Sequence, residues 1–134
     1  ATFAKIKDQF KAGCLSEDEI LTTIKTCFNE TGYLLDTHTA IGYGVLKQYQ
    51  QETGDHTKTV LLSTASPYKF PESVYQAIYG EELDVYTAID KLSEKTGVPV
   101  PQALAGIKER EVLHKEAIDK TEIISFIKSE IEAM

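Results

Sequence analysis

The chain has 134 residues, of which 42% are hydrophobic and 26% are charged, and its formal net charge is −7. This size and composition are typical of one soluble globular domain with a modest core. The acidic balance argues against binding to nucleic acid or to an anionic membrane, and no stretch approaches the roughly 18 apolar residues of a membrane span. Two isolated cysteines, Cys14 and Cys27, lack metal-ligand spacing and fit a reducing, cytoplasmic environment.

Residues 1–32 predict a pair of amphipathic helices. Apolar residues recur at helical spacing at the start of the chain, and Gly13 is expected to end the first helix. Ser16 and Glu19 form the pattern of a capping box for the second helix, and Gly32 is expected to end it.

Residues 33–66 predict a strand, a helix and a second strand. The apolar run 33–35 indicates a very short strand, and the helix is expected from about 38 to 52. The run 60–62 is apolar without alternation, which is typical of a strand covered on both faces. We therefore predict an α/β, helix-rich fold with a short parallel βαβ unit and a right-handed crossover.

The helix of this unit contains two glycines in its interior. Asp36 or Thr37 is expected to cap it, and Gly42 and Gly44 follow in its first turns. Each glycine costs about 1 kcal/mol relative to alanine in a helix interior. Their presence predicts that another backbone comes close at this face.

Residues 67–134 predict a mostly helical C-terminal part. Helices are expected to begin near Pro71, after Asp84 and after Asp119, with a short helical turn before the last of them. The segment 111–118 is expected to be mainly extended.

Hydroxyl side chains gather where the second predicted strand ends. Ser63, Thr64 and Ser66 stand at the carboxyl end of that strand, which is where ligands bind in open α/β sheets. The alternative is an ordinary loop leading into a capped helix, and composition alone favours that alternative.

Three stretches resemble one enzyme family in order and spacing. STASPYKFPESV resembles the threonine synthase signature T-A-H-P-A-K-F-x-E-S-V, and GYLLDTHTAIGYGVL resembles its G-Y-x-x-[DE]-P-H-T-A-V-G. PVPQALAGI is a weaker match to a late proline-rich turn. The resemblance implies the C-terminal segment of a longer enzyme that depends on pyridoxal 5′-phosphate (PLP). That enzyme has the tryptophan-synthase-β-like fold, also called fold type II.

The resemblance also implies roles for four side chains. Thr64 is the hydroxyl aligned with the partner of the PLP ring nitrogen, and Ser63 is the second choice. Lys69 and Ser66 are aligned with contacts to the substrate, O-phospho-L-homoserine, which the family converts with water to L-threonine and phosphate. Without the resemblance, we would expect the Thr64 side chain to hydrogen-bond to the backbone at the end of a strand. Lys69 would then be an ordinary surface lysine at the start of a helix.

The chain departs from the family pattern. Ser66, Thr37 and Tyr68 stand where histidine, proline and alanine are usual. The F-K-D context of the Schiff-base lysine and the glycine loop for the cofactor phosphate are missing from these residues. We therefore expect no catalytic residue in this segment, no activity without the N-terminal part, and self-association of the isolated chain.

Two other functions stay open from the sequence. One is another PLP-dependent lyase of the same fold, similar to threonine dehydratase. The other is a non-catalytic interaction or regulatory domain. For His38, a packing or capping role is favoured over acid–base chemistry, and His56 and His114 are expected at the surface because neither has neighbours at metal-ligand spacing.

Overall fold

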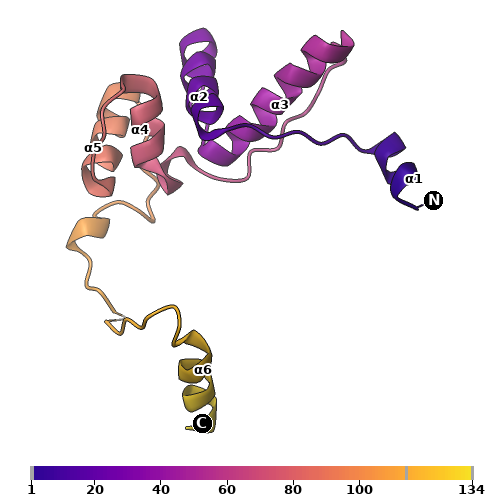
Figure 1. The fold of residues 1–134 in the computed structure, drawn as a ribbon. Coiled ribbons are helices and arrows are strands. Elements are labelled where there is room, and N and C mark those ends of the chain that lie inside the picture. Colours follow the sequence, from indigo (N-terminus) through magenta and orange to yellow (C-terminus); the bar gives the residue numbers. More distant parts are fainter. Residues whose placement is uncertain (1, 114, 134) are drawn as a thin grey trace.

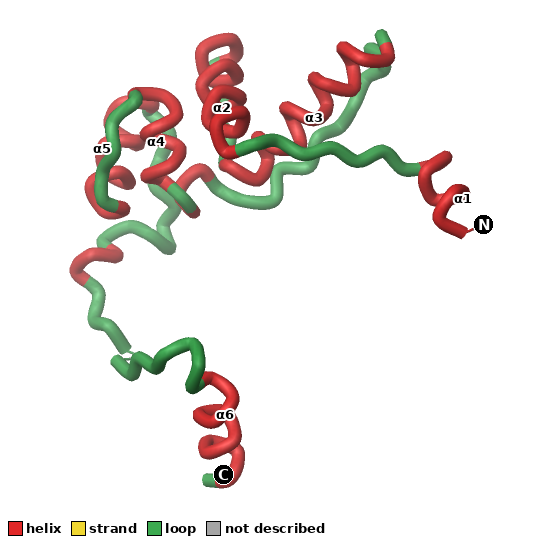
Figure 2. Tube along the Cα trace, in the orientation of Figure 1, coloured by secondary structure: helices red, strands yellow, loops and turns green. Residues whose placement is uncertain are grey.

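The computed structural model describes residues 2–113 and 115–133, and over these residues every regular element is a helix (Figures 1 and 2). The elements are α1 (Thr2–Gln9), α2 (Glu17–Thr31), α3 (Thr37–Thr53), the short 3-10 helix η1 (Pro67–Lys69), α4 (Pro71–Tyr79), α5 (Val85–Thr96), η2 (Ile107–Glu109) and α6 (Ile123–Glu132). In the part of the chain described, no helix is both long and apolar enough to cross a bilayer.

The core lies among α2, α3, α4 and α5. Helix α2 packs against both α3 and α4, and α4 packs against α5. Each of these four helices contributes side chains with no exposed surface: Ile24 of α2, Ala40 of α3, Val74 and Tyr75 of α4, and Leu92 of α5. Leu34 joins them from the connection between α2 and α3.

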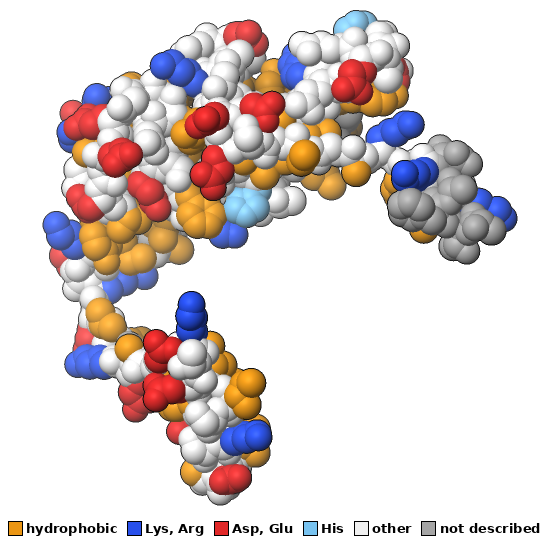
Figure 3. Space-filling model, in the orientation of Figure 1, with side chains coloured by type: hydrophobic (Ala, Val, Ile, Leu, Met, Phe, Trp, Pro, Cys, Tyr) orange, Lys and Arg blue, Asp and Glu red, His pale blue; other side chains and the backbone are white. Residues whose placement is uncertain are grey.

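Helices α1 and α6 stand apart from this core in Figure 1. Helix α6 repeats isoleucine at helical spacing, and Ile124, Ile127 and Ile131 are all more than half exposed. Hydrophobic side chains are visible along α6 in the space-filling view of Figure 3. An apolar stripe of this kind is what a helix normally buries against a neighbour.

The predicted βαβ unit is wrong. Over the described residues neither 33–35 nor 60–62 forms a strand, although the helix between them is present as α3. A strand exists only where another backbone completes its hydrogen-bond ladder, and neither segment has such a partner among the residues that the structure describes. The run 60–62 is also not covered on both faces, since Val60 is 83% and Leu62 is 76% exposed.

Helix ends follow the local signals closely. Ser16 and Glu19 form the predicted capping box of α2, and Gly32 ends that helix in the left-handed conformation at φ 73°. Asp84 caps α5 as predicted. Gly13, however, does not end α1, which stops at Gln9.

The prediction that another backbone comes close to the glycines of α3 is wrong, because side chains fill the space beside them. A Cβ added to Gly44 would lie 2.5 Å from Leu15 Cδ1, and one added to Gly42 would lie 3.0 Å from Leu61 Cδ1. These contacts fold the chain before α2 and the chain after α3 onto the same helix.

Candidate functional site

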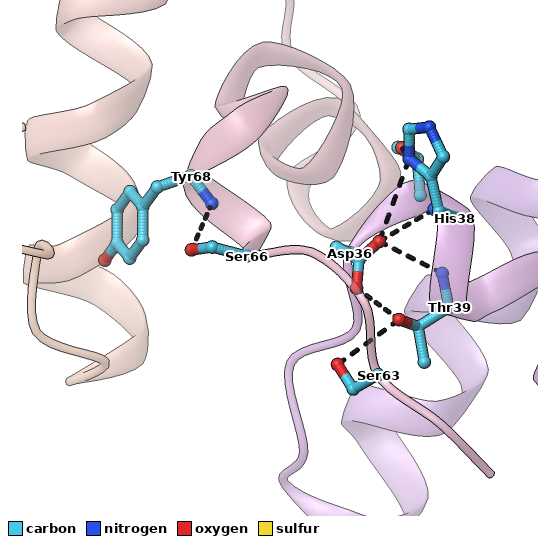
Figure 4. A network of polar contacts seen from close by, with 7 residues as sticks. Asp36, His38, Thr39, Ser63, Ser66 and Tyr68 are labelled. Carbon is cyan, nitrogen blue, oxygen red and sulfur yellow. Dashed lines mark hydrogen bonds and ion pairs between the residues drawn. The ribbon is translucent and has the colours of Figure 1, made fainter.

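One of the predicted site residues, Ser63, lies where its segment passes the N-terminal end of α3, next to Thr39 (Figure 4). Figure 4 shows Asp36, Thr39 and Ser63 grouped together, with Ser66 and Tyr68 further along the same connecting segment. The site is thus built on two helix starts, that of α3 and that of η1.

Asp36 is a buried carboxylate that caps α3. Its Oδ1 accepts hydrogen bonds from the backbone N–H groups of His38, at 2.9 Å, and Thr39, at 3.0 Å. Its Oδ2 accepts a hydrogen bond from the Thr39 hydroxyl. The carboxylate therefore satisfies backbone donors that have no partner inside the helix, and it also holds a side chain of the first turn.

These contacts set the charge state of Asp36. Burial acts to raise the pKa of its carboxyl group, but the hydrogen bonds from Thr39 and His38 together outweigh burial and leave the pKa below its usual value. Nδ1 of His38 lies 3.8 Å from Oδ1 of Asp36. At neutral pH the group at this helix start is therefore an anion, as the helix dipole favours.

Thr39 connects α3 to the predicted ligand segment. Its Oγ1 lies 3.3 Å from Oγ of Ser63, a residue 24 positions further along the chain. Thr39 is only 4% exposed, so this link sits at the edge of the core. Ser63 is thereby tied to the start of α3.

Ser66 and Tyr68 fix the next turn. Ser66 Oγ accepts a hydrogen bond of 3.2 Å from the backbone N–H of Tyr68, which makes Ser66 the cap of η1. The buried Tyr68 hydroxyl donates to the carbonyl oxygen of Val98 at 2.5 Å. Burial raises the pKa of this hydroxyl, and a hydrogen bond with Ser93 opposes the rise. Ser66 is therefore engaged in folding the chain.

An aromatic contact joins the starts of α3 and α4. The His38 ring stacks on Phe70, with the ring centroids 5.7 Å apart and the planes inclined by 16°. The ammonium group of Lys69 lies 5.7 Å from the centroid of the same Phe70 ring. His38 thus has a packing partner, and Lys69 extends from the exposed side of the turn.

Thr64 differs from its neighbours because its side chain is unengaged. It is exposed, and among the described residues its hydroxyl makes no hydrogen bond. The ring nitrogen of PLP needs one hydrogen-bonding group, and a threonine hydroxyl has the chemistry to supply it. The other groups that the cofactor requires, a lysine in F-K-D and a glycine loop for its phosphate, do not occur in these residues.

The structure brings Ser63 to the start of α3, while Ser66 caps η1 and Lys69 is the last residue of η1. Sequence reasoning did not find the link from Asp36 through Thr39 to Ser63. The spacing Asp-x-x-Thr was a usable signal, because a capping carboxylate can also accept from a hydroxyl three residues on.

Comparisons with known proteins identify the family. A family model described as "Threonine synthase, C-terminal" matches residues 39–127, which include Thr39, Ser63 and Thr64. The chain belongs to this family. The resemblance seen in the sequence motifs is therefore confirmed.

Individual relatives agree with the family. The chain is 32% identical over 111 residues to "Threonine synthase-like 1" of Mus musculus, covering 80% of this chain and 14% of the relative. It is 35% identical over 72 residues to "Threonine synthase" of Pseudomonas aeruginosa, covering 54% of this chain and 15% of that protein. It is 40% identical over 82 residues to "Threonine synthase" of Haemophilus influenzae, covering 60% of this chain and 18% of that protein.

The chain thus spans less than a fifth of the length of these curated relatives. No solved structure was found to match it.

Proposed function

We propose that residues 1–134 are the C-terminal segment of a PLP-dependent threonine synthase, a cytoplasmic lyase of threonine biosynthesis. The intact enzyme converts O-phospho-L-homoserine and water to L-threonine and phosphate. The family match over residues 39–127 supports this assignment. The remaining, N-terminal part of the same enzyme is the partner that this segment requires, since it carries the lysine and the phosphate loop.

The single observation that carries the proposed role is the free Thr64 hydroxyl beside an anchored Ser63. We assign Thr64 to the ring nitrogen of PLP. When bound, PLP supplies an electron sink for bond changes at the substrate α-carbon. A neutral hydroxyl stabilises a protonated ring nitrogen less well than a carboxylate does, so Thr64 tunes the strength of that sink.

Lys69 is proposed to contact the substrate phosphate. It is exposed, it lies in the turn before α4, and the start of that helix presents backbone donors that favour anions. Ser66 has a smaller part, because its hydroxyl oxygen already caps η1. Ser66 contributes to substrate binding only indirectly, because it holds the turn that carries Lys69 in place.

Assays of the full-length protein test the proposal. The protein should release threonine and phosphate in equal amounts from O-phosphohomoserine. A threonine dehydratase-like lyase would instead convert threonine to a 2-oxo acid and ammonia. A non-catalytic domain would do neither. Either of these results would refute the assignment.

Substitution of Lys69 tests the phosphate contact. We expect Lys69→Gln to raise KM for O-phosphohomoserine about tenfold, as for loss of a hydrogen bond to a charged group. Lys58→Gln is the matched control, since Lys58 is an exposed lysine in the preceding loop. Equal effects of the two substitutions would refute a specific role for Lys69.

A further inference from the structure

Counting protons settles the direction of the hydrogen bonds at the start of α3. The Thr39 hydroxyl lies within reach of both Asp36 Oδ2 and Ser63 Oγ. A hydroxyl has one proton to donate, and an ionised carboxylate can only accept. Thr39 therefore donates to Asp36, and the Ser63 hydroxyl is left to donate to Thr39.

This direction separates the two candidate cofactor contacts. When the exposed Ser63 hydroxyl donates to Thr39, its proton points inward, towards Thr39 and the buried carboxylate. The adjacent Thr64 hydroxyl makes no hydrogen bond within the described residues and keeps its proton available. Of the two neighbouring hydroxyls, only Thr64 is a free donor.

A second capping site in the chain shows that the link to Ser63 is an addition to ordinary capping. At α5, Asp84 accepts from the backbone N–H of Thr87, and its other oxygen accepts from the Thr87 hydroxyl. Over the described residues, Thr87 makes no hydrogen bond to a third hydroxyl. Asp84 is exposed, whereas Asp36 is only 3% exposed. The start of α3 therefore has both a buried anion and an extra partner.

We propose that Asp36 is a positioning residue for the cofactor contact: through Thr39 it holds the Ser63 proton inward and leaves Thr64 as the donor to the PLP ring nitrogen. This inference rests on the proposed function, because it presupposes that the cofactor binds beside residue 64. It assigns a role to a carboxylate that does not touch the cofactor.

The test uses the full-length enzyme freed of cofactor and titrated with PLP. Thr39→Val removes the connecting hydroxyl but leaves Asp36 able to cap the backbone of α3. We expect it to weaken PLP binding about fivefold, as for loss of one hydrogen bond, and to shift the absorbance of the bound cofactor. Thr39→Ser keeps the hydroxyl and should restore both quantities to within about twofold of the wild type.

Thr37→Val is the matched control. Thr37 lies in the same turn, and its hydroxyl contacts the His38 ring at 3.2 Å and not Ser63. It should leave the PLP dissociation constant and the absorbance unchanged. If Thr37→Val and Thr39→Val weaken PLP binding equally, the helix start has only a structural role and the inference is overturned.

Asp36→Asn tests the direction of the hydrogen bonds between Thr39 and Ser63, because the new side chain can still cap the backbone of α3. The amide nitrogen of the new side chain donates to Thr39, so Thr39 then donates to Ser63 and the Ser63 proton turns outward. We expect a shifted cofactor absorbance with little change in the melting temperature of the cofactor-free enzyme. An unchanged absorbance would overturn the inference.

Thr64→Val separates this inference from the proposed function. If Thr64→Val changes PLP binding and absorbance while Thr39→Val and Asp36→Asn change neither, the positioning role fails and the cofactor contact stands. If Thr64→Val itself changes neither, the cofactor contact is refuted and the positioning role falls with it.

Discussion

Removal of the Asp36 side chain should cost more stability than removal of the matching side chain at α5. Asp36 and Asp84 each start an Asp-x-x-Thr cap, and each accepts from two backbone N–H groups and from the hydroxyl of the threonine. The pair differs in burial, since Asp36 is 3% exposed and Asp84 lies at the surface. Comparison of the two alanine variants therefore isolates the effect of burial on one hydrogen-bond pattern.

The expected loss at Asp36 has two parts. Loss of an N-cap side chain costs about 0.5–2 kcal/mol. The buried Thr39 hydroxyl also loses its carboxylate acceptor, and a buried polar group without a partner costs about 1–3 kcal/mol. Ser63 can still accept from Thr39, which places this second part near its lower limit. We expect Asp36→Ala to lower the free energy of unfolding by about 1.5–3 kcal/mol.

Urea unfolding followed by circular dichroism measures both variants in the 134-residue chain. Asp84→Ala should cause a clearly smaller loss, because water replaces the lost acceptor at the surface. The dependence of the unfolding free energy on urea should not change in either variant, since the exposed surface is similar. Equal losses of unfolding free energy in the two variants would refute the view that burial makes the Asp36 cap more stabilising than the Asp84 cap.

Four further results are expected. Because hydrogen bonds hold the pKa of Asp36 below its usual value, the ionised carboxylate stabilises the folded chain fully above the ordinary carboxyl pKa of about 4. This stabilisation should be lost as the pH falls through the lower pKa of the folded state, and Asp36→Asn should weaken that acid sensitivity in urea unfolding. Tyr68→Phe should destabilise the chain by about 1–2 kcal/mol in the same assay, because the buried carbonyl contact to Val98 is lost. The isolated chain should neither form threonine nor retain PLP through gel filtration, and retention with turnover would contradict the missing lysine motif. Sedimentation should show self-association that weakens in a Val60→Ser, Leu62→Ser variant, while a concentration-independent monomer would show that these exposed apolar side chains need no cover.

Local chemistry made most of the helices predictable. The Ser16 capping box, the aspartate caps and the glycines that end α2 and α5 each act within a few residues, so the sequence shows them directly. The strands could not be predicted in the same way. The run 60–62 has strand composition, but a strand depends on a partner backbone that the described residues do not provide.

The candidate site was predictable only in part. The hydroxyls at Ser63 and Thr64 stood out by their place in a family motif, not by their chemistry. The contact that distinguishes them joins Thr39 to Ser63 across 24 residues, and only the folded chain brings these two side chains together. Local spacing could indicate the Asp36–Thr39 pair, but not the residue to which it connects.

The cofactor contact of Thr64 is tested most directly by the absorbance and turnover of the full-length Thr64→Val enzyme. The change keeps the shape of the side chain and removes its hydroxyl. Thr59→Val is the matched control, because the Thr59 hydroxyl donates to the Thr57 carbonyl within the preceding loop. We predict a shifted cofactor absorbance and slower threonine formation for Thr64→Val, with both unchanged for Thr59→Val. Unchanged absorbance and turnover in Thr64→Val would contradict the assignment.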